Sequence, residues 1–172
     1  MGPVSAAVEI DVPRSVAFAE HCDLSRRPSF TDHFISDFHL TRIDPIGLGA
    51  GARFRFHTFP RHLWMDTTIT EVSEPQRIVE HGRGGRTNRI PSTTVWELLE
   101  GPGSLITVRV SFWTEPSSHV DRAIDSLGMA SVWLGRGWRE ALNRLRDQLE
   151  SGAGQEEPVE VAGGNPHATG IP

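Results

Sequence analysis

The chain has 172 residues, a length that suits one domain with a short appendage. Its formal net charge of -5 at pH 7 argues against a dedicated nucleic-acid binder, because neutralising phosphates requires a basic face. The absence of Lys and Tyr excludes lysine Schiff-base chemistry, a P-loop lysine and a tyrosine general acid. No run of apolar residues reaches membrane-span length and no leader pattern opens the chain, which predicts a cytoplasmic protein without stable membrane insertion.

The first elements are predicted to be a strand and two short helices. In residues 4–12, Val and Ile alternate with mostly polar residues, as in a half-buried strand. Pro13 suits the first turn of a helix that continues to about Cys22. A second short helix is predicted within residues 25–33. The lone Cys22 excludes an internal disulfide, and its place in this helical pattern favours a buried or half-buried small hydrophobe over a nucleophile.

Six further strand-length segments follow, separated by turn signals. Pro45 with the Gly-rich run at 47–51, then Pro60, Pro75 and Gly101-Pro102-Gly103, mark the turns. The predicted strands cover residues 34–43, 52–59, 63–72, 76–82, 92–100 and 104–114.

The period of the apolar residues changes from two to about 3.6 after Ser118, which predicts one amphipathic helix to Glu150. Gly135 and Gly137 weaken this helix. They would either admit close packing or a ligand, or merely kink the helix. Residues 151–172 are rich in Gly and Pro and poor in large apolar residues, so we expect residues 1–150 to form the domain and 151–172 a disordered tail.

The order of these elements resembles the START/Bet v 1-like (SRPBCC) superfamily, in particular its bacterial polyketide cyclase/dehydrase and lipid-transport group. The similarity rests on the opening VEIDVPRSVAF, the turn and strand GLGAGARFRF, the segment ITEVSEPQRIVEHG, the hairpin TTVWELLEGPGSLITVRVSF and the terminal LNRLRDQLE. It implies an α+β helix-grip fold: a seven-stranded antiparallel sheet curled around a long C-terminal helix, with two short helices after strand 1. It also implies an apolar cavity between the sheet and the helix.

A cavity with aromatic walls is a common form of small-molecule site. Apolar alternation alone does not distinguish a cavity wall from a solid core, so that alternative stays open. The residues predicted to line the cavity are Phe54, Phe56, Met65, Thr67, His81, Trp96, Leu98, Val108, Val110, Phe112, Leu127, Ala130, Trp133 and Leu134.

His81 is the best candidate for a polar or catalytic role. It alternates with Glu80, so if Glu80 faces water, His81 faces the interior, where it would orient a ligand or act as a general base. The alternatives are a core histidine satisfied by a neighbour, or a strand whose phase is shifted by one residue. Arg83, Arg86 and Arg89 lie in one loop and either bind an anionic group at the cavity mouth or are solvated.

Other site chemistries find no support. The eight His residues lack metal-ligand spacing, no G-x-S-x-G motif is present, and the glycine runs do not join a strand to a helix. We therefore expect no metal and no cofactor.

Three functions remain. The first is binding of a small hydrophobic molecule such as a lipid, fatty acid or polyketide, by a monomer or homodimer. The second is an enzyme, a polyketide cyclase/aromatase or dehydratase using the same cavity. The third is an interaction module, which would need an exposed apolar patch on the outer face of the sheet. It is ranked last because that face is polar, with Arg53, Arg55, His57 and Glu97.

Overall fold

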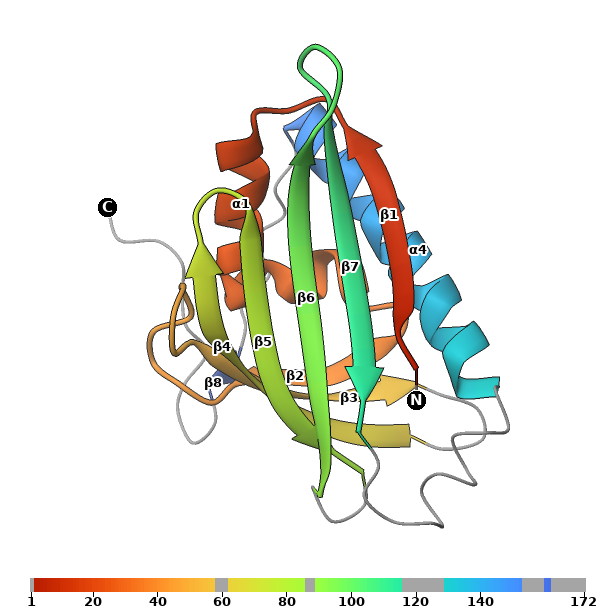
Figure 1. Cartoon of the computed structure of the whole chain (residues 1–172). Helices are drawn as coiled ribbons and strands as arrows, with labels where there is room; N and C mark the ends of the chain where they lie inside the picture. The colour runs from red at the N-terminus through yellow and green to blue at the C-terminus, as the bar shows by residue number, and fades with distance from the viewer. Residues whose placement is uncertain (1, 58–61, 86–88, 116–128, 153–159, 162–172) are drawn as a thin grey trace.

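The computed structural model describes residues 2–57, 62–85, 89–115, 129–152 and 160–161. The predicted order of elements is confirmed in these residues (Figure 1). They are β1 (Val4–Ile10), α1 (Arg14–Cys22), a 3-10 turn (Leu24–Arg26), α2 (Arg27–Thr31), β2 (Ile35–Leu40), β3 (Gly51–His57), β4 (His62–Ser73), β5 (Arg77–Gly84), β6 (Ile90–Glu100), β7 (Ile106–Thr114), α4 (Met129–Ser151) and β8 (Glu160–Val161).

Seven antiparallel strands form the predicted sheet. Strands β2 to β7 pair as a continuous meander, and β1 returns to pair with β7, which gives the order β1-β7-β6-β5-β4-β3-β2. The sheet curls so that α4 lies against its concave side (Figure 1). The α+β helix-grip fold predicted from the sequence is thus confirmed.

Two irregularities bend the strands of this sheet. The register of β2 against β3 shifts between Ser36 and His39, where Asp37 adopts a positive φ of 53°. The register of β4 against β5 shifts between Ile69 and Glu71. Since a bulge bends its strand and increases the local twist, both shifts favour the curl that encloses the helix.

The core is the space between the concave face and α4. The helix buries Leu134, Trp138, Ala141, Leu142 and Leu145, a stripe at three- and four-residue spacing. Trp138 is the centre of an aromatic group: its ring centroid lies 5.1 Å from Phe34, 6.2 Å from Phe56 and 5.5 Å from Trp96. The concave face of the sheet and α4 therefore pack against each other through aromatic rings, and we call the space between them the grip.

The two glycines in the described part of α4 differ in their surroundings. A Cβ at Gly137 would lie 2.5 Å from the buried ring of Phe34, whereas one at Gly135 would meet only Val4, at 3.5 Å. Gly137 thus permits close packing, one of the roles left open by the sequence.

Gly137→Ala is expected to lower the free energy of unfolding by about 1–2 kcal/mol, because overpacking outweighs the gain in helix propensity. The matched variant Gly135→Ala should raise it by up to about 1 kcal/mol. Urea unfolding of both variants measures the difference. Equal effects would mean that the Phe34 ring moves aside freely.

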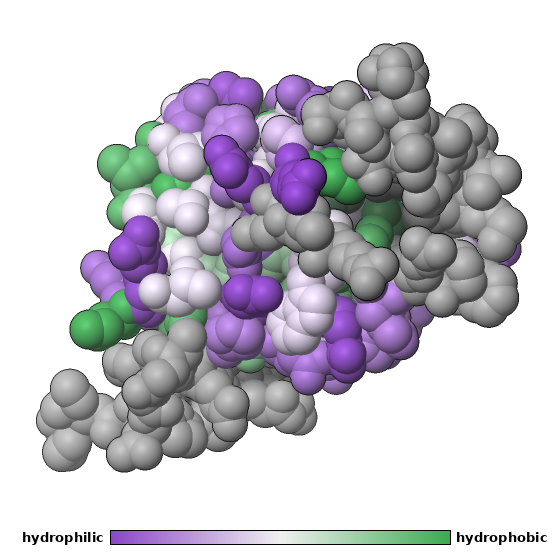
Figure 2. Space-filling view, turned by 90° about the horizontal axis from the view of Figure 1, so that it is seen from below, coloured by the Kyte–Doolittle hydropathy of each residue, from purple (hydrophilic) through white to green (hydrophobic). Residues whose placement is uncertain are grey.

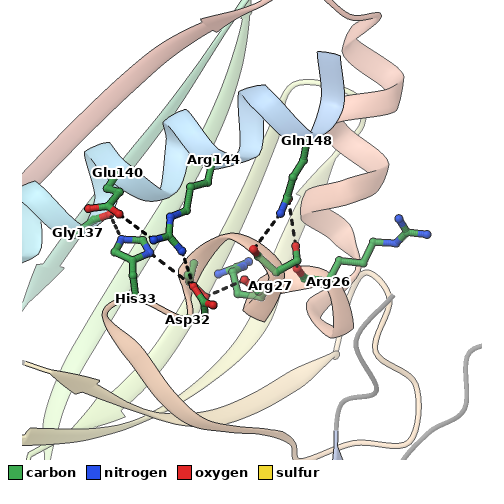
Figure 3. Close-up of polar contacts among 10 residues, drawn as sticks. Arg26, Arg27, Asp32, His33, Gly137, Glu140, Arg144 and Gln148 are labelled. Atoms are coloured by element: carbon green, nitrogen blue, oxygen red, sulfur yellow. Dashed lines mark hydrogen bonds and ion pairs between the residues drawn. The ribbon is translucent and has the colours of Figure 1, made fainter. Parts of the chain in front are cut away.

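A polar seam holds α2 against α4 (Figure 3). Arg144 pairs with Asp32 at 2.6 Å, His33 Nε2 donates to the Gly137 carbonyl at 3.1 Å, and Gln148 Nε2 donates to the Ser29 carbonyl at 2.9 Å. These contacts position the short α2 beneath the long helix. Because α2 begins at Arg27, the seam also positions that residue.

Two residues of the C-terminal segment add a short strand to the sheet. Glu160 and Val161 form β8, which pairs in parallel with His39 and Leu40 on the edge strand β2. The first part of the predicted terminal helix, residues 116–128, lies outside the described residues.

Candidate functional site

Strand β5 places Glu80, and not His81, inside the grip. Glu80 is 2% exposed, whereas His81 is exposed on the convex face, where its Nδ1 lies 2.7 Å from Thr70 Oγ1. The prediction of an inward His81 was wrong, since the strand phase is shifted by one residue. Ile78 is fully buried, and the two-residue period of a strand carries Glu80 to the same face.

The buried Glu80 carboxylate accepts three hydrogen bonds. Arg27 Nη2 donates to Oε1 at 2.7 Å and Trp96 Nε1 donates to the same oxygen at 2.8 Å. Thr67 Oγ1 donates to Oε2 at 3.1 Å. A buried charge is tolerated when it is paired and hydrogen-bonded, which explains how Glu80 is accommodated in an apolar core.

Arg27 completes the pair from the other side of the core. Only 4% of its side chain is exposed, and its guanidinium carbon lies 4.8 Å from the centroid of the Trp96 ring. Trp96 therefore contacts both partners: it donates a hydrogen bond to the carboxylate and presents its ring to the cation. The Arg27–Glu80 salt bridge and the Trp96 ring therefore form one connected group of side chains.

His21 adds a neutral imidazole to this unit. It is fully buried on α1, and its ring centroid lies 4.5 Å from that of Trp96. Its Nδ1 lies 2.7 Å from the Ala17 carbonyl oxygen, which only accepts, so Nδ1 carries the proton. Burial lowers the pKa of His21 to about 4, so near neutral pH Nε2 is an unprotonated acceptor. We call His21, Arg27, Thr67, Glu80 and Trp96 the Glu80 cluster.

In the part of the chain that the structure describes, three polar atoms in or beside the Glu80 cluster are buried without a hydrogen-bond partner: His21 Nε2, Arg27 Nε and Trp138 Nε1. Nearly all buried polar groups in folded proteins are hydrogen-bonded, to protein or to water. His21, Arg27 and Trp138 all pack around the Trp96 ring, so the three unpaired atoms belong to one region of the interior.

The structure buries most of the predicted cavity residues, which are apolar apart from Thr67 and lie on the sheet or, for Leu134, on α4. They are Phe54, Phe56, Met65, Thr67, Trp96, Leu98, Val108, Val110, Phe112 and Leu134. The prediction fails for Trp133, which is 49% exposed because it lies off the buried stripe of α4. Leu127 lies outside the described residues, and nothing is described of the Ala130 side chain.

The lower end of the molecule is where β5 and β7 end and α4 begins (Figure 1). Seen from this side, Figure 2 shows hydrophobic residues among the hydrophilic ones of the described surface. The segments 86–88 and 116–128, which adjoin these strand and helix ends in the chain, lie outside the described residues.

The arginines predicted for a cavity mouth belong to the β5–β6 hairpin, where Arg83 pairs with Pro91, two residues after Arg89. Arg83 is exposed on β5 and lines a shallow depression of about 280 Å³ together with Asp66 and His81. Arg89 is exposed directly before β6, and Arg86 lies outside the described residues.

A larger groove, of about 740 Å³, lies outside the grip between α1, the β2–β3 loop and the β4–β5 turn. Phe18, Cys22 and Val72 contribute apolar side chains to it. Burial, and secondly the Glu74 carboxylate, raise the pKa of the Cys22 thiol to about 11, so the thiol stays protonated near neutral pH. Cys22 is buried, as the sequence predicts.

Two further features bear on the kind of site. Within the described ranges, no group of three or more His, Cys, Asp or Glu side chains lies close enough together to hold a metal ion. No described helix combines the length and apolar character needed to cross a membrane.

Comparison with known proteins identifies the fold. No family profile and no curated protein matches the sequence. Among solved structures, the KanY protein superposes with a TM-score of 0.65 at 18% identity, covering 87% of this chain and 99% of that one. DynU16, a putative protein of the dynemicin biosynthetic locus, gives 0.58 at 19% identity; the match covers 90% of this chain but 49% of DynU16. Major latex-like protein 151 from Panax ginseng gives 0.54 at 11%, covering 88% and 96%.

The sheet gripping a long helix defines an α+β helix-grip protein. These solved structures share this fold, and it is the fold that the sequence resemblance implies. At these identities the likeness establishes the fold and leaves the function to the site itself.

Sequence reasoning missed three members of the site: His21, Arg27 and Glu80. The phase of β5 was not readable from Ile78 alone, because its neighbour Val79 is also apolar and buried. Nothing in the sequence indicated that Arg27, 53 positions away, would neutralise the carboxylate.

Proposed function

We propose that the protein binds a small, mainly hydrophobic molecule inside the grip, beside the Glu80 cluster. The observation that carries this proposal is the set of unpaired polar atoms, His21 Nε2, Arg27 Nε and Trp138 Nε1, within an otherwise aromatic interior. Ligand sites typically combine apolar walls with a few polar groups that fix orientation. The interior of this protein has that composition.

The solved relatives lend general support. DynU16 is described as a putative protein of a biosynthetic locus for dynemicin. A polyketide-like ligand is therefore one candidate, beside a lipid. The Glu80 cluster would bind the polar part of such a molecule, and the rings of Phe54, Phe56 and Phe112 would contact the apolar part.

A second candidate is a cyclase/aromatase or dehydratase acting in the same interior. His21 favours it, because an unprotonated Nε2 buried beside a carboxylate is a possible general base. Binding ranks first because a base is most effective when its pKa lies near the working pH, and the pKa of His21 is about 4.

A neutral fluorescent probe such as 1-aminoanthracene is expected to bind the wild-type protein and gain emission. Thr94 faces the interior on β6, opposite Glu80 and Phe112, so Thr94→Phe should fill part of the site. We expect the affinity to fall by about tenfold, equivalent to 1.4 kcal/mol.

Thr68→Phe is the matched control, because Thr68 lies on the convex side opposite the exposed His81. It should leave the affinity within about twofold, well below the 1.4 kcal/mol of a tenfold change. A wild-type protein that binds no neutral apolar probe would contradict the proposal. Native mass spectrometry of protein purified from its own host would then identify the class of any co-purified ligand.

A further inference from the structure

The unpaired atoms of the interior form a defined hydrogen-bonding pattern. His21 Nε2 accepts, because the single imidazole proton is on Nδ1, bonded to the Ala17 carbonyl. Trp138 Nε1 and Arg27 Nε can only donate. A partner for all of them must therefore both donate and accept.

The charges of the interior limit that partner further. Arg27 and Glu80, 4% and 2% exposed, form a pair with no net charge. A ligand carboxylate placed here would leave one uncompensated negative charge beside Glu80 in an apolar core. Such a charge is costly, whereas a neutral hydroxyl adds none.

A hydroxyl group meets both requirements. Its hydrogen can be donated to His21 Nε2, and its oxygen can accept from an N–H group. A ketone or ether accepts only and would leave His21 Nε2 unpaired. A carboxylate likewise lacks a proton to donate.

We propose that the ligand places a neutral hydroxyl, as in a phenol, enol or alcohol, between His21 Nε2 and the Trp138 or Arg27 N–H, and that the interior discriminates against carboxylates. This inference rests on the proposed function and narrows it: free fatty acids, one of the classes considered from the sequence, are disfavoured. The discriminating groups are the acceptor His21 on α1 and the donor, which is Trp138 on α4 or Arg27 on α2.

Three ligands of one ring system test the inference in the wild-type protein: naphthalene, 2-naphthol and 2-naphthoate, titrated by ligand-observed NMR at pH 7. We expect 2-naphthol to bind about five- to tenfold more tightly than naphthalene, the effect of one or two net hydrogen bonds. We expect 2-naphthoate to bind more weakly than naphthalene, because its charge must be buried unpaired.

Variants then show which residues cause the preference for 2-naphthol over naphthalene. Trp138→Phe keeps an aromatic ring and removes only the indole donor, and His21→Phe removes the acceptor. His21→Phe should reduce the advantage of 2-naphthol over naphthalene, measured in the same variant, to about twofold or less, and Trp138→Phe should do the same where the indole is the donor. His81→Phe, the same substitution on the convex face, should retain the full advantage.

The outcomes separate the two proposals. If none of the three ligands binds, the proposed function itself fails. If naphthalene binds but 2-naphthol has no advantage, the ligand site stands, the hydroxyl inference fails, and ordered water is the partner of the unpaired atoms. Tightest binding of 2-naphthoate, or an advantage that survives both His21→Phe and Trp138→Phe, also overturns the inference.

Discussion

Glu80→Gln is expected to lower the free energy of unfolding by about 3 kcal/mol, the low end of the cost of breaking a buried ion pair. The substitution keeps the shape of the side chain but leaves the Arg27 guanidinium, 4% exposed, without a counter-charge. It also weakens the acceptor to which Trp96 Nε1 donates at 2.8 Å. Urea unfolding followed by tryptophan emission measures the change.

Glu71→Gln is the matched control for this prediction. Glu71 also pairs with an arginine, Arg77, at 2.9 Å, but both side chains are nearly half exposed. Because solvent screens an exposed pair, we expect a loss below about 1 kcal/mol. The double variant Arg27→Met with Glu80→Met should be markedly more stable than Glu80→Gln, since it leaves no buried charge unpaired. Equal losses for Glu80→Gln and Glu71→Gln would mean that water reaches Arg27.

The free energy of unfolding is expected to decrease as the pH is lowered from about 6.5 to 4, because of His21. In the folded protein burial lowers the pKa of this imidazole to about 4, against 6.5 when it is exposed. In this interval the unfolded chain binds a proton that the folded chain does not, so acid favours unfolding. The contribution of His21 is fully present above pH 6.5 and decreases by about 3 kcal/mol at pH 4.

Comparison with His21→Phe at each pH isolates this contribution, because the other acidic and basic groups titrate alike in both proteins. Glu20 is one of them: burial raises its pKa, which gives a pH dependence of opposite sign. We expect the stability difference between wild type and His21→Phe to change by about 3 kcal/mol from pH 7 to pH 4. A difference independent of pH would show that His21 is solvated in the folded state.

The sequence predicted the site only where a local pattern carries the information. Alternation placed Phe54 and Phe56 on the inner face, and both are buried. The same reasoning failed at residues 80 and 81, because it assumed that a carboxylate faces water. Within Ile78–His81 the apolar residues Ile78 and Val79 are adjacent, so hydrophobicity alone does not choose the phase. Trp133, beside Leu134 on one helix, was misplaced for a similar reason: a Trp suits either a core or a partly exposed position.

By itself the sequence determined the order of the elements, because hydrophobic periodicity and turn residues act over short stretches of chain, and the family resemblance of that order implied the helix-grip architecture. Only the tertiary structure decided the character of the interior. Burying Glu80 is tolerable because the polar seam between α2 and α4 positions α2, and with it Arg27, against the sheet, 53 positions from its partner. The free Nε2 of His21 likewise depends on its backbone bond to Ala17 and on the packing of α1 over Trp96. Tertiary folding brings a buried charge such as Glu80 into contact with its counter-charge, Arg27. Because the two residues lie far apart in the sequence, their pairing leaves no local pattern in it.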